Sequence, residues 1–169
     1  FGIRNGMILL LNVVTALVIG LLTEQLAVVA VFTLSFMVLR SYTGGYHSDS
    51  RVFCYLGSNL VLLVPVYTQA VFYKTSLAWL LAVLLVSAGI IFLLSPMHSK
   101  NRKLDKEEQK HFGRKARLIA ALELAVLGIL WHAGQIPYAY AVYTGICITA
   151  LFMLVGKAQL WIQSHTENG

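Results

Sequence analysis

The feature that most constrains this chain is a succession of long apolar runs. A transmembrane helix needs about 20 apolar residues to cross a hydrocarbon core about 30 Å thick. Runs near this length occupy residues 7–23, 25–39, 53–72, 76–96, 118–133 and 137–162. Charged residues make up only 12% of the chain, against about 25% in a typical soluble domain. The sequence therefore predicts an all-α, polytopic membrane protein with about six transmembrane helices and two polar loops.

The basic residues predict the orientation of these helices. If all six runs cross the membrane, the N-terminus, loop 40–52, loop 97–117 and the C-terminus share one side. Twelve of the 13 Lys and Arg residues lie on that side, and only Lys74 lies on the other. Because positive residues are retained in the cytoplasm, both polar loops are predicted to face it. The net charge of +6 is then explained by topology and membrane lipids, so we predict no nucleic-acid partner.

The polar stretch from Arg40 to Cys54 carries the residues best suited to catalysis. Cys54 is expected near the start of the third helix, where the helix N-terminus and Arg51 favour a nucleophilic thiolate. His47 is suited to act as a general base or as the imidazolium of an ion pair. The alternative is that Cys54 is a small apolar residue packed within a helix, which is common for cysteine.

The spacing of His47 and Cys54 constrains the backbone between them. Seven residues of continuous helix rise about 10.5 Å, which is too far for a hydrogen bond. We therefore expect a bend between the two residues, with the helix beginning near residue 49 or 50. Gly44 and Gly45 permit such a turn and could offer backbone N–H groups to an oxyanion. They are equally compatible with an ordinary turn at the membrane interface.

Four further residues are candidates for supporting this site. Arg40 either reaches the lipid headgroups or binds a carboxylate. Asp49 either orients His47 or caps the following helix. Ser58 and Asn59 lie one turn beyond Cys54 and could also reach the site. Because the His and Cys spacing matches no common zinc pattern, we predict no metal site. The proposed chemistry also needs no cofactor.

The second polar loop holds most of the positive charge. Residues 105–117 are expected to form a short charged helix on the membrane surface, which either fixes the topology by touching anionic lipid or docks an acidic peptide. The candidates for docking are Lys100, Arg102 and Lys103. In the next run, Glu123 is an intramembrane carboxylate, for which Arg117 or a neighbouring Lys is the expected partner. Cys147 is interpreted as a packing residue.

Several segments resemble the accessory gene regulator B (AgrB) family of Gram-positive bacteria. The resemblance is carried by Arg40, the segment Gly44-Gly45-Tyr46-His47, Cys54 and Ser58. It continues in Ser95-Pro96, Asn101-Arg102-Lys103 and Glu107, and begins at Phe1-Gly2-Ile3. The whole chain, 1–169, is therefore expected to form one AgrB-like membrane peptidase domain, whose usual N-terminal segment is expected to be missing.

The resemblance implies an activity and a partner. AgrB proteins are membrane cysteine endopeptidases that process the AgrD pro-peptide of a quorum-sensing system in the bacterial cell membrane. The catalytic pair of the family corresponds to His47 and Cys54. The resemblance implies that Cys54 forms an acyl-thioester, from which the peptide cyclises to a thiolactone or lactone. It also implies a homodimer and adds weight to the basic loop as a docking surface for the acidic pro-peptide tail.

Two other functions are compatible with the sequence. A transporter or exporter would use the helical bundle, with Glu123 inside it and Pro65 and Gly89 as weak signals of interrupted helices. A membrane scaffold would use the basic loop to bind a soluble partner or anionic lipid. In either case, modifying Cys54 should leave the function unchanged.

Overall fold

The computed structural model describes residues 2–43, 51–96 and 106–166. These residues form seven helices, without a strand among them: α1 (Gly2–Leu22), α2 (Leu26–Thr43), α3 (Arg51–Tyr67), α4 (Gln69–Lys74), α5 (Leu77–Leu94), α6 (Lys106–His132) and α7 (Ile136–Thr166). Among them, α2, α5 and the segment Ile136–Gln159 of α7 are long and apolar enough to cross a membrane. The prediction of an all-α membrane protein is confirmed. The exact number of six spans remains a prediction.

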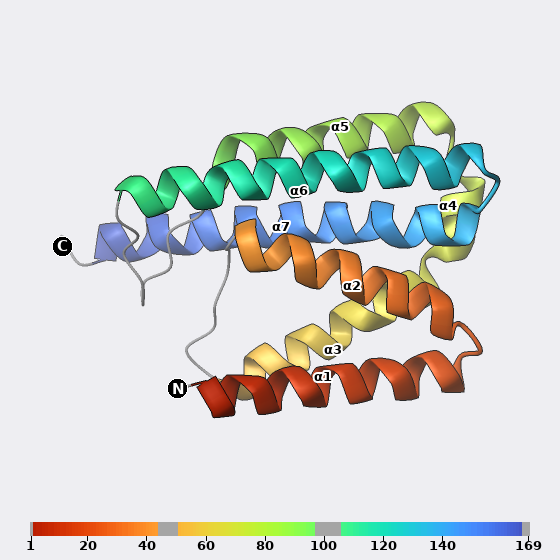
Figure 1. Ribbon diagram of the computed structural model, residues 1–169, viewed down its shortest axis with the longest axis horizontal. Coiled ribbons are helices and arrows are strands. Elements are labelled where there is room, and N and C mark those ends of the chain that lie inside the picture. The colour runs from red at the N-terminus through yellow and green to blue at the C-terminus, as the bar shows by residue number, and fades with distance from the viewer. Residues whose placement is uncertain (1, 44–50, 97–105, 167–169) are drawn as a thin grey trace.

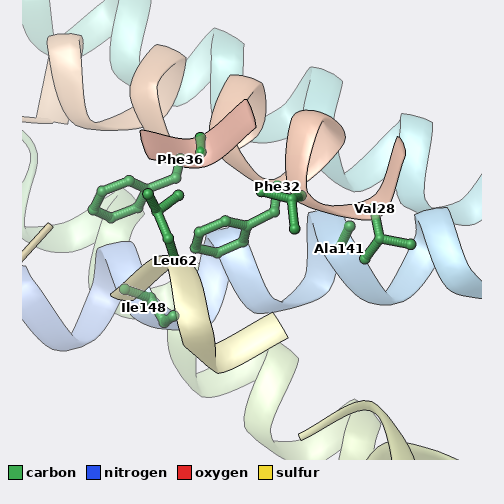
Figure 2. Close-up of a cluster of buried hydrophobic side chains, with 8 residues drawn as sticks. Val28, Phe32, Phe36, Leu62, Ala141 and Ile148 are labelled. Atoms are coloured by element: carbon green, nitrogen blue, oxygen red, sulfur yellow. The ribbon is translucent and has the colours of Figure 1, made fainter. Parts of the chain in front are cut away.

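The long helix α7 lies at the centre of the bundle. Figure 1 shows α5 and α6 on one side of it, α1 and α3 on the other, and α2 alongside it. On the side of α1 and α3, Phe32 and Phe36 of α2 stack with ring centroids 5.8 Å apart. Figure 2 shows these rings beside Leu62 of α3 and Ile148 of α7. On the side of α5 and α6, a second cluster is centred on Ile146 and Met153 of α7.

The surface of the bundle is largely apolar. Leucine and valine side chains are exposed on the outward faces of α1, α5 and α6. Several buried positions instead hold small polar residues, including Ser35, Ser87, Thr144 and Thr149. Thr144 and Thr149 donate to the backbone carbonyls of the residues four earlier in α7, at 2.8 Å each. Hydroxyls satisfied in this way can be buried without an unpaired donor, which suits a protein whose outer surface faces lipid.

The helices alternate in direction, so their ends gather at two ends of the bundle. At the end that lies to the left in Figure 1, α2 and α5 finish, and α1, α3 and α6 begin, beside the C-terminal end of α7. We call this the basic end, because it includes Arg40, Lys110, Arg114, Lys115 and Lys157. Lys74 closes α4 at the opposite end. The arrangement agrees with the distribution of charge from which the orientation was predicted.

The predicted span 53–72 is interrupted, which corrects the expectation of one continuous helix. α3 ends at Tyr67 and α4 begins at Gln69. Pro65 lies within α3, where it lacks an N–H donor and weakens the helix. Thr68 lies between the two helices, and its hydroxyl hydrogen-bonds the Tyr140 hydroxyl of α7. The interruption therefore lies near one end of the bundle and is held against the central helix.

The basic segment before the fifth predicted span is also different from the expectation. Residues 106–117 do not form a separate surface helix but continue directly into α6. Gly113 is the residue in this segment most able to break a helix, yet it lies against the end of α5. A Cβ atom at Gly113 would be 2.9 Å from Pro96 Cδ. The absence of a side chain thus allows the charged segment to pack on α5 while it remains helical.

Candidate functional site

The residues predicted for catalysis belong to the stretch of sequence that runs from the end of α2 into α3. α2 ends at Thr43 and α3 is described from Arg51. Gly44, Gly45, His47 and Asp49 fall between these helices and lie outside the described residues. The backbone of Cys54 lies in the first described turn of α3, whereas its side chain is outside the described part. A cysteine in this position is close to the partial positive charge of a helix N-terminus.

Arg40 is held inside the bundle, in the last turn of α2. Its guanidinium carbon lies 4.6 Å from the ring centroid of Phe152 on α7 and 5.7 Å from that of Phe36. Both distances are within the range of cation–π attraction. The side chain is only half-exposed, so it does not extend toward the lipid headgroups as a snorkelling arginine would. Phe152 was not predicted as part of this region, because it lies far along the chain.

Ser58 and Asn59 occupy the next turn of α3 after Cys54, and both are half-buried. The side-chain oxygen Oδ1 of Asn59 is buried and accepts no hydrogen bond from the described residues. A buried acceptor without a donor carries a desolvation penalty. Asn59 is therefore a buried polar residue of α3 whose carbonyl oxygen carries this penalty.

The predicted docking residues Lys100, Arg102 and Lys103 lie in the segment 97–105, outside the described residues. The adjoining turns of α6 carry further basic side chains on the protein surface. Lys110, Arg114, Lys115 and Arg117 are all exposed there. The same outward face of the helix becomes apolar from Leu118 onward, at Leu118, Leu122, Val126 and Ile129. The outward face of α6 thus changes from basic to apolar near Leu118.

A polar cluster that the sequence did not predict joins α2, α6 and α7. The Ser35 hydroxyl of α2 donates to Glu123 Oε2 of α6 at 2.8 Å. Gly145 of α7 lies beside them, since a Cβ atom there would be 2.6 Å from Ser35 Oγ. The expected pairing of Glu123 with Arg117 is wrong, because Arg117 Nε donates to the Phe92 carbonyl at 3.2 Å instead. The only indication of this cluster in the sequence was Glu123, as a carboxylate within an apolar run.

The second cysteine lies within the bundle and contacts other helices. Cys147 is a half-buried free thiol of α7. It hydrogen-bonds Ser87 of α5 and Tyr143, one turn earlier in α7, which agrees with its interpretation as a packing residue. Among the residues that the structure describes, no group of three His, Cys, Asp or Glu side chains is arranged to hold a metal ion.

Comparison with known proteins identifies relatives over most of the chain. The model of the family described as accessory gene regulator B matches residues 1–154. The accessory gene regulator protein B of Staphylococcus intermedius is 26% identical over 156 residues, covering 90% of this chain and 80% of that protein. No solved structure matches the chain. The family match includes the predicted catalytic stretch, the basic part of α6 and the Ser35–Glu123 cluster.

Proposed function

The chain belongs to the accessory gene regulator B family, and from that premise we propose that it is a membrane cysteine endopeptidase. Membership supports a part in the maturation of a quorum-sensing peptide. The substrate in this proposal is an AgrD-like pro-peptide, and the catalytic residues are Cys54 and His47. The reaction takes place on the cytoplasmic face of the cell membrane, at the basic end of the bundle.

The first step is cleavage of one peptide bond. His47 accepts the thiol proton of Cys54, and the resulting thiolate attacks the carbonyl carbon of that bond. The C–N bond then breaks, and the imidazolium of His47 returns the proton to the leaving amine. The C-terminal tail of the pro-peptide departs, and the remaining peptide is held as an acyl-thioester on Cys54. Backbone N–H groups at Gly44 and Gly45 would stabilise the oxyanion formed during the attack.

The second step closes a ring and regenerates the enzyme. A cysteine thiol within the bound peptide attacks the thioester carbonyl, forming a thiolactone, and Cys54 regains its proton. A serine hydroxyl in the same position would give a lactone. Exchange of one thioester for another requires little energy, provided that water is kept from the acyl-enzyme. A site at the membrane interface favours that exclusion.

The observation that carries this proposal is the position of Cys54 on the backbone. It lies in the first described turn of α3, at the basic end of the bundle, shortly after His47 in the sequence. A helix N-terminus favours the thiolate form of cysteine. Cys147 has none of these features, because it lies within α7 and its thiol contacts Ser87 and Tyr143. The chain thus supplies its own matched control cysteine.

Binding of the substrate is assigned to the basic surface beside the site. Lys100, Arg102 and Lys103, with the exposed basic turns of α6, would attract an acidic peptide tail. An amphipathic pro-peptide lying on the inner leaflet would be delivered to the same level. Asn59, Ser58 and Arg40 are proposed as supporting residues, and Asp49 as an orienting partner for His47. The proposal also includes membrane lipids as partners and a homodimeric assembly.

Cleavage of an AgrD-like pro-peptide in membranes tests the proposal. Cys54→Ala and His47→Ala should each abolish cleavage, whereas Cys147→Ala should retain it, with all three proteins present in the membrane at equal levels. Trapping of a peptide thioester on Cys54 would identify the covalent step. Normal cleavage by either of the first two variants would exclude the proposed mechanism.

Transport is the second candidate function, and the Ser35–Glu123 hydrogen bond is the observation that favours it. An ionisable residue inside a membrane bundle often marks a transport pathway. Peptide export from proteoliposomes that persists in Cys54→Ala and is lost in Glu123→Gln would support a transport function. If export is lost in Cys54→Ala but not in Glu123→Gln, export requires prior processing of the peptide.

A further inference from the structure

A cavity of about 590 Å³ lies between α5 and α6 at the end of the bundle opposite the basic end. Its walls come from α4, α5, α6 and α7, near the α4–α5 connection and the turn between α6 and α7 (Figure 1). Leu80 and Leu84 of α5 face Leu127 and Gly128 of α6 across it. Its volume is within the usual range for small-molecule sites. Neither the proposed chemistry nor the basic surface uses this region.

α5 and α6 contact each other near the basic end and leave the cavity between them at the other end. Near the basic end the two helices are in close contact, at Gly113 beside Pro96 and at the Arg117–Phe92 hydrogen bond. At the cavity, a Cβ atom added to Gly128 would have no neighbour within 4 Å. Glycine weakens a helix interior, and no packing contact requires it at Gly128. Its effect is to leave one wall of the cavity without a side chain.

The lining is apolar except at one end. Six of the lining residues are leucines or alanine, with Phe72 and Tyr143 alongside. Phe72 is buried against Tyr143, with ring centroids 5.3 Å apart. The Tyr143 hydroxyl is already engaged by the Cys147 thiol. A peptide segment in this space would therefore leave its backbone N–H and C=O groups without partners, which is costly. A hydrocarbon chain has no such groups.

The cavity is also open to the membrane. Leu77 and Trp131 contribute to its lining while 53% and 38% of their surfaces remain exposed. Trp131 and His132 end α6, and aromatic residues at a helix end are typical of the level of lipid headgroups. A lipid whose headgroup lies beside His132 would thus have its hydrocarbon portion at the level of the leucines.

We propose that this cavity binds one acyl chain of a membrane phospholipid. The chain enters from the bilayer between α5 and α6 and packs against Leu80, Leu84 and Leu127. Its headgroup lies beside Trp131 and His132. The site is separate from the proposed peptidase site, which lies at the other end of the bundle. A lipid bound there would contact both α5 and α6.

Photolabelling of the full chain in lipid nanodiscs tests this inference. The probe is a phospholipid with a photoreactive diazirine in its acyl chain, and the labelled residues are located by mass spectrometry. In nanodiscs of methyl-branched phospholipid, whose chains fit the cavity poorly, we expect labelling of Leu80, Leu84 and Leu127 to saturate at low probe content and to be displaced by added straight-chain phospholipid. Labelling of Leu85 and Leu93 should instead rise in proportion to probe content. Leu85 and Leu93 are suitable references because they are 72% and 83% exposed on the same helix.

Filling the cavity provides the matched comparison. Gly128→Leu should reduce labelling of the three cavity residues about tenfold, because the added side chain displaces several methylene groups. Gly89→Leu should leave labelling unchanged, since Gly89 also has nothing within 4 Å of an added Cβ atom and does not line the cavity. Gly128→Ala, a smaller change, should give an intermediate loss and keeps the test informative if the leucine variant does not fold.

Three results would overturn the inference. Labelling of Leu80 and Leu84 that rises in proportion to probe content, as labelling of Leu85 does, would indicate ordinary surrounding lipid. Undiminished labelling in both Gly128→Leu and Gly128→Ala would place the probe elsewhere. Displacement of the probe by a processed cyclic peptide, but not by unlabelled phospholipid, would assign the cavity to the peptide.

Discussion

At the scale of single residues, the polar groups inside the bundle have specific partners from distant parts of the sequence. Arg40 lies over Phe152, and Ser35 donates to Glu123. The sequence indicated Arg40 and Glu123 as unusual, because each is a charged residue at or within an apolar run. It could not indicate their partners, since Phe and Ser are common in such runs. The assignment of His47 and Cys54 to catalysis stays a prediction, made from their closeness in one polar stretch.

Replacing Arg40 should show how much its contact with the Phe152 ring contributes to stability. Arg40→Lys keeps the charge but loses the flat guanidinium that lies over Phe152. We expect a loss of about 1 kcal/mol in the free energy of unfolding, measured as a lower thermal midpoint in detergent. Lys157→Arg, at an exposed position of α7, is the control and should change the midpoint little. An unchanged midpoint for Arg40→Lys would show that the ring contact contributes nothing.

Gly145 should be intolerant of a side chain. A Cβ atom there would meet Ser35 Oγ at 2.6 Å, so Gly145→Ala should force Ser35 away from Glu123 and destabilise the protein by about 1–3 kcal/mol. Adding Ser35→Ala to this variant removes the clashing oxygen and should restore part of the loss. The comparison needs the thermal midpoints of both single variants and the double variant. Strict additivity of the two changes would contradict the proposed clash.

At the scale of elements, hydropathy predicted the presence of the helices better than their ends. The prediction for 76–96 differs little from α5, Leu77–Leu94. The run 53–72 was read as one helix, although Pro65 and the Thr68–Tyr140 contact divide it into α3 and α4. The sequence predicts a separate charged helix over residues 105–117, because the change in polarity after Arg117 resembles a helix boundary. The helical backbone continues through that change, since contact between Gly113 and Pro96 supports it.

The contact between Gly113 of α6 and Pro96, just after α5, should contribute to stability. Gly113→Ala should separate the two helices, because its Cβ atom would lie 2.9 Å from Pro96 Cδ, and should lower stability by about 1 kcal/mol or more. Gly89→Ala has open space and should instead raise stability by up to about 1 kcal/mol through helix propensity. Thermal unfolding of both variants in the same detergent measures the difference. Equal shifts for the two variants would exclude a specific role for the Gly113–Pro96 contact.

At the scale of the whole molecule, the bundle buries small polar residues and exposes large apolar ones. This pattern followed from the composition, which lacked enough charge to cover a soluble surface. The central position of α7 did not follow from the sequence, because α7 is no more apolar on average than α2 and is less apolar than α5. The alternation of helix directions was predictable, since nearly all Lys and Arg residues fall in alternate connections. How the helices pack depends on contacts between distant residues, which no local pattern encodes.

Orientation in the membrane is testable with single cysteines. In a protein carrying Cys54→Ser and Cys147→Ser, Lys115→Cys should react with an impermeant thiol reagent only in inside-out vesicles. Lys74→Cys, at the other end of the bundle, should react in intact cells. The physical reason is the retention of positive residues in the cytoplasm. The reverse pattern would place the proposed peptidase site outside the cell.

The continuity of α6 has a consequence for the proposed cleavage of a peptide. Residues 106–117 form about 18 Å of rigid rod beyond the point where the outward face becomes apolar. The helix therefore sets the distance of each basic residue from Lys110 to Arg117 from that point. If the proposed substrate tail binds to these residues, the turn of α6 to which it binds sets its distance from the apolar part of the helix. Under the proposed peptidase function, deleting one turn should bring the bound tail about 5.4 Å closer and change the position of cleavage along the peptide.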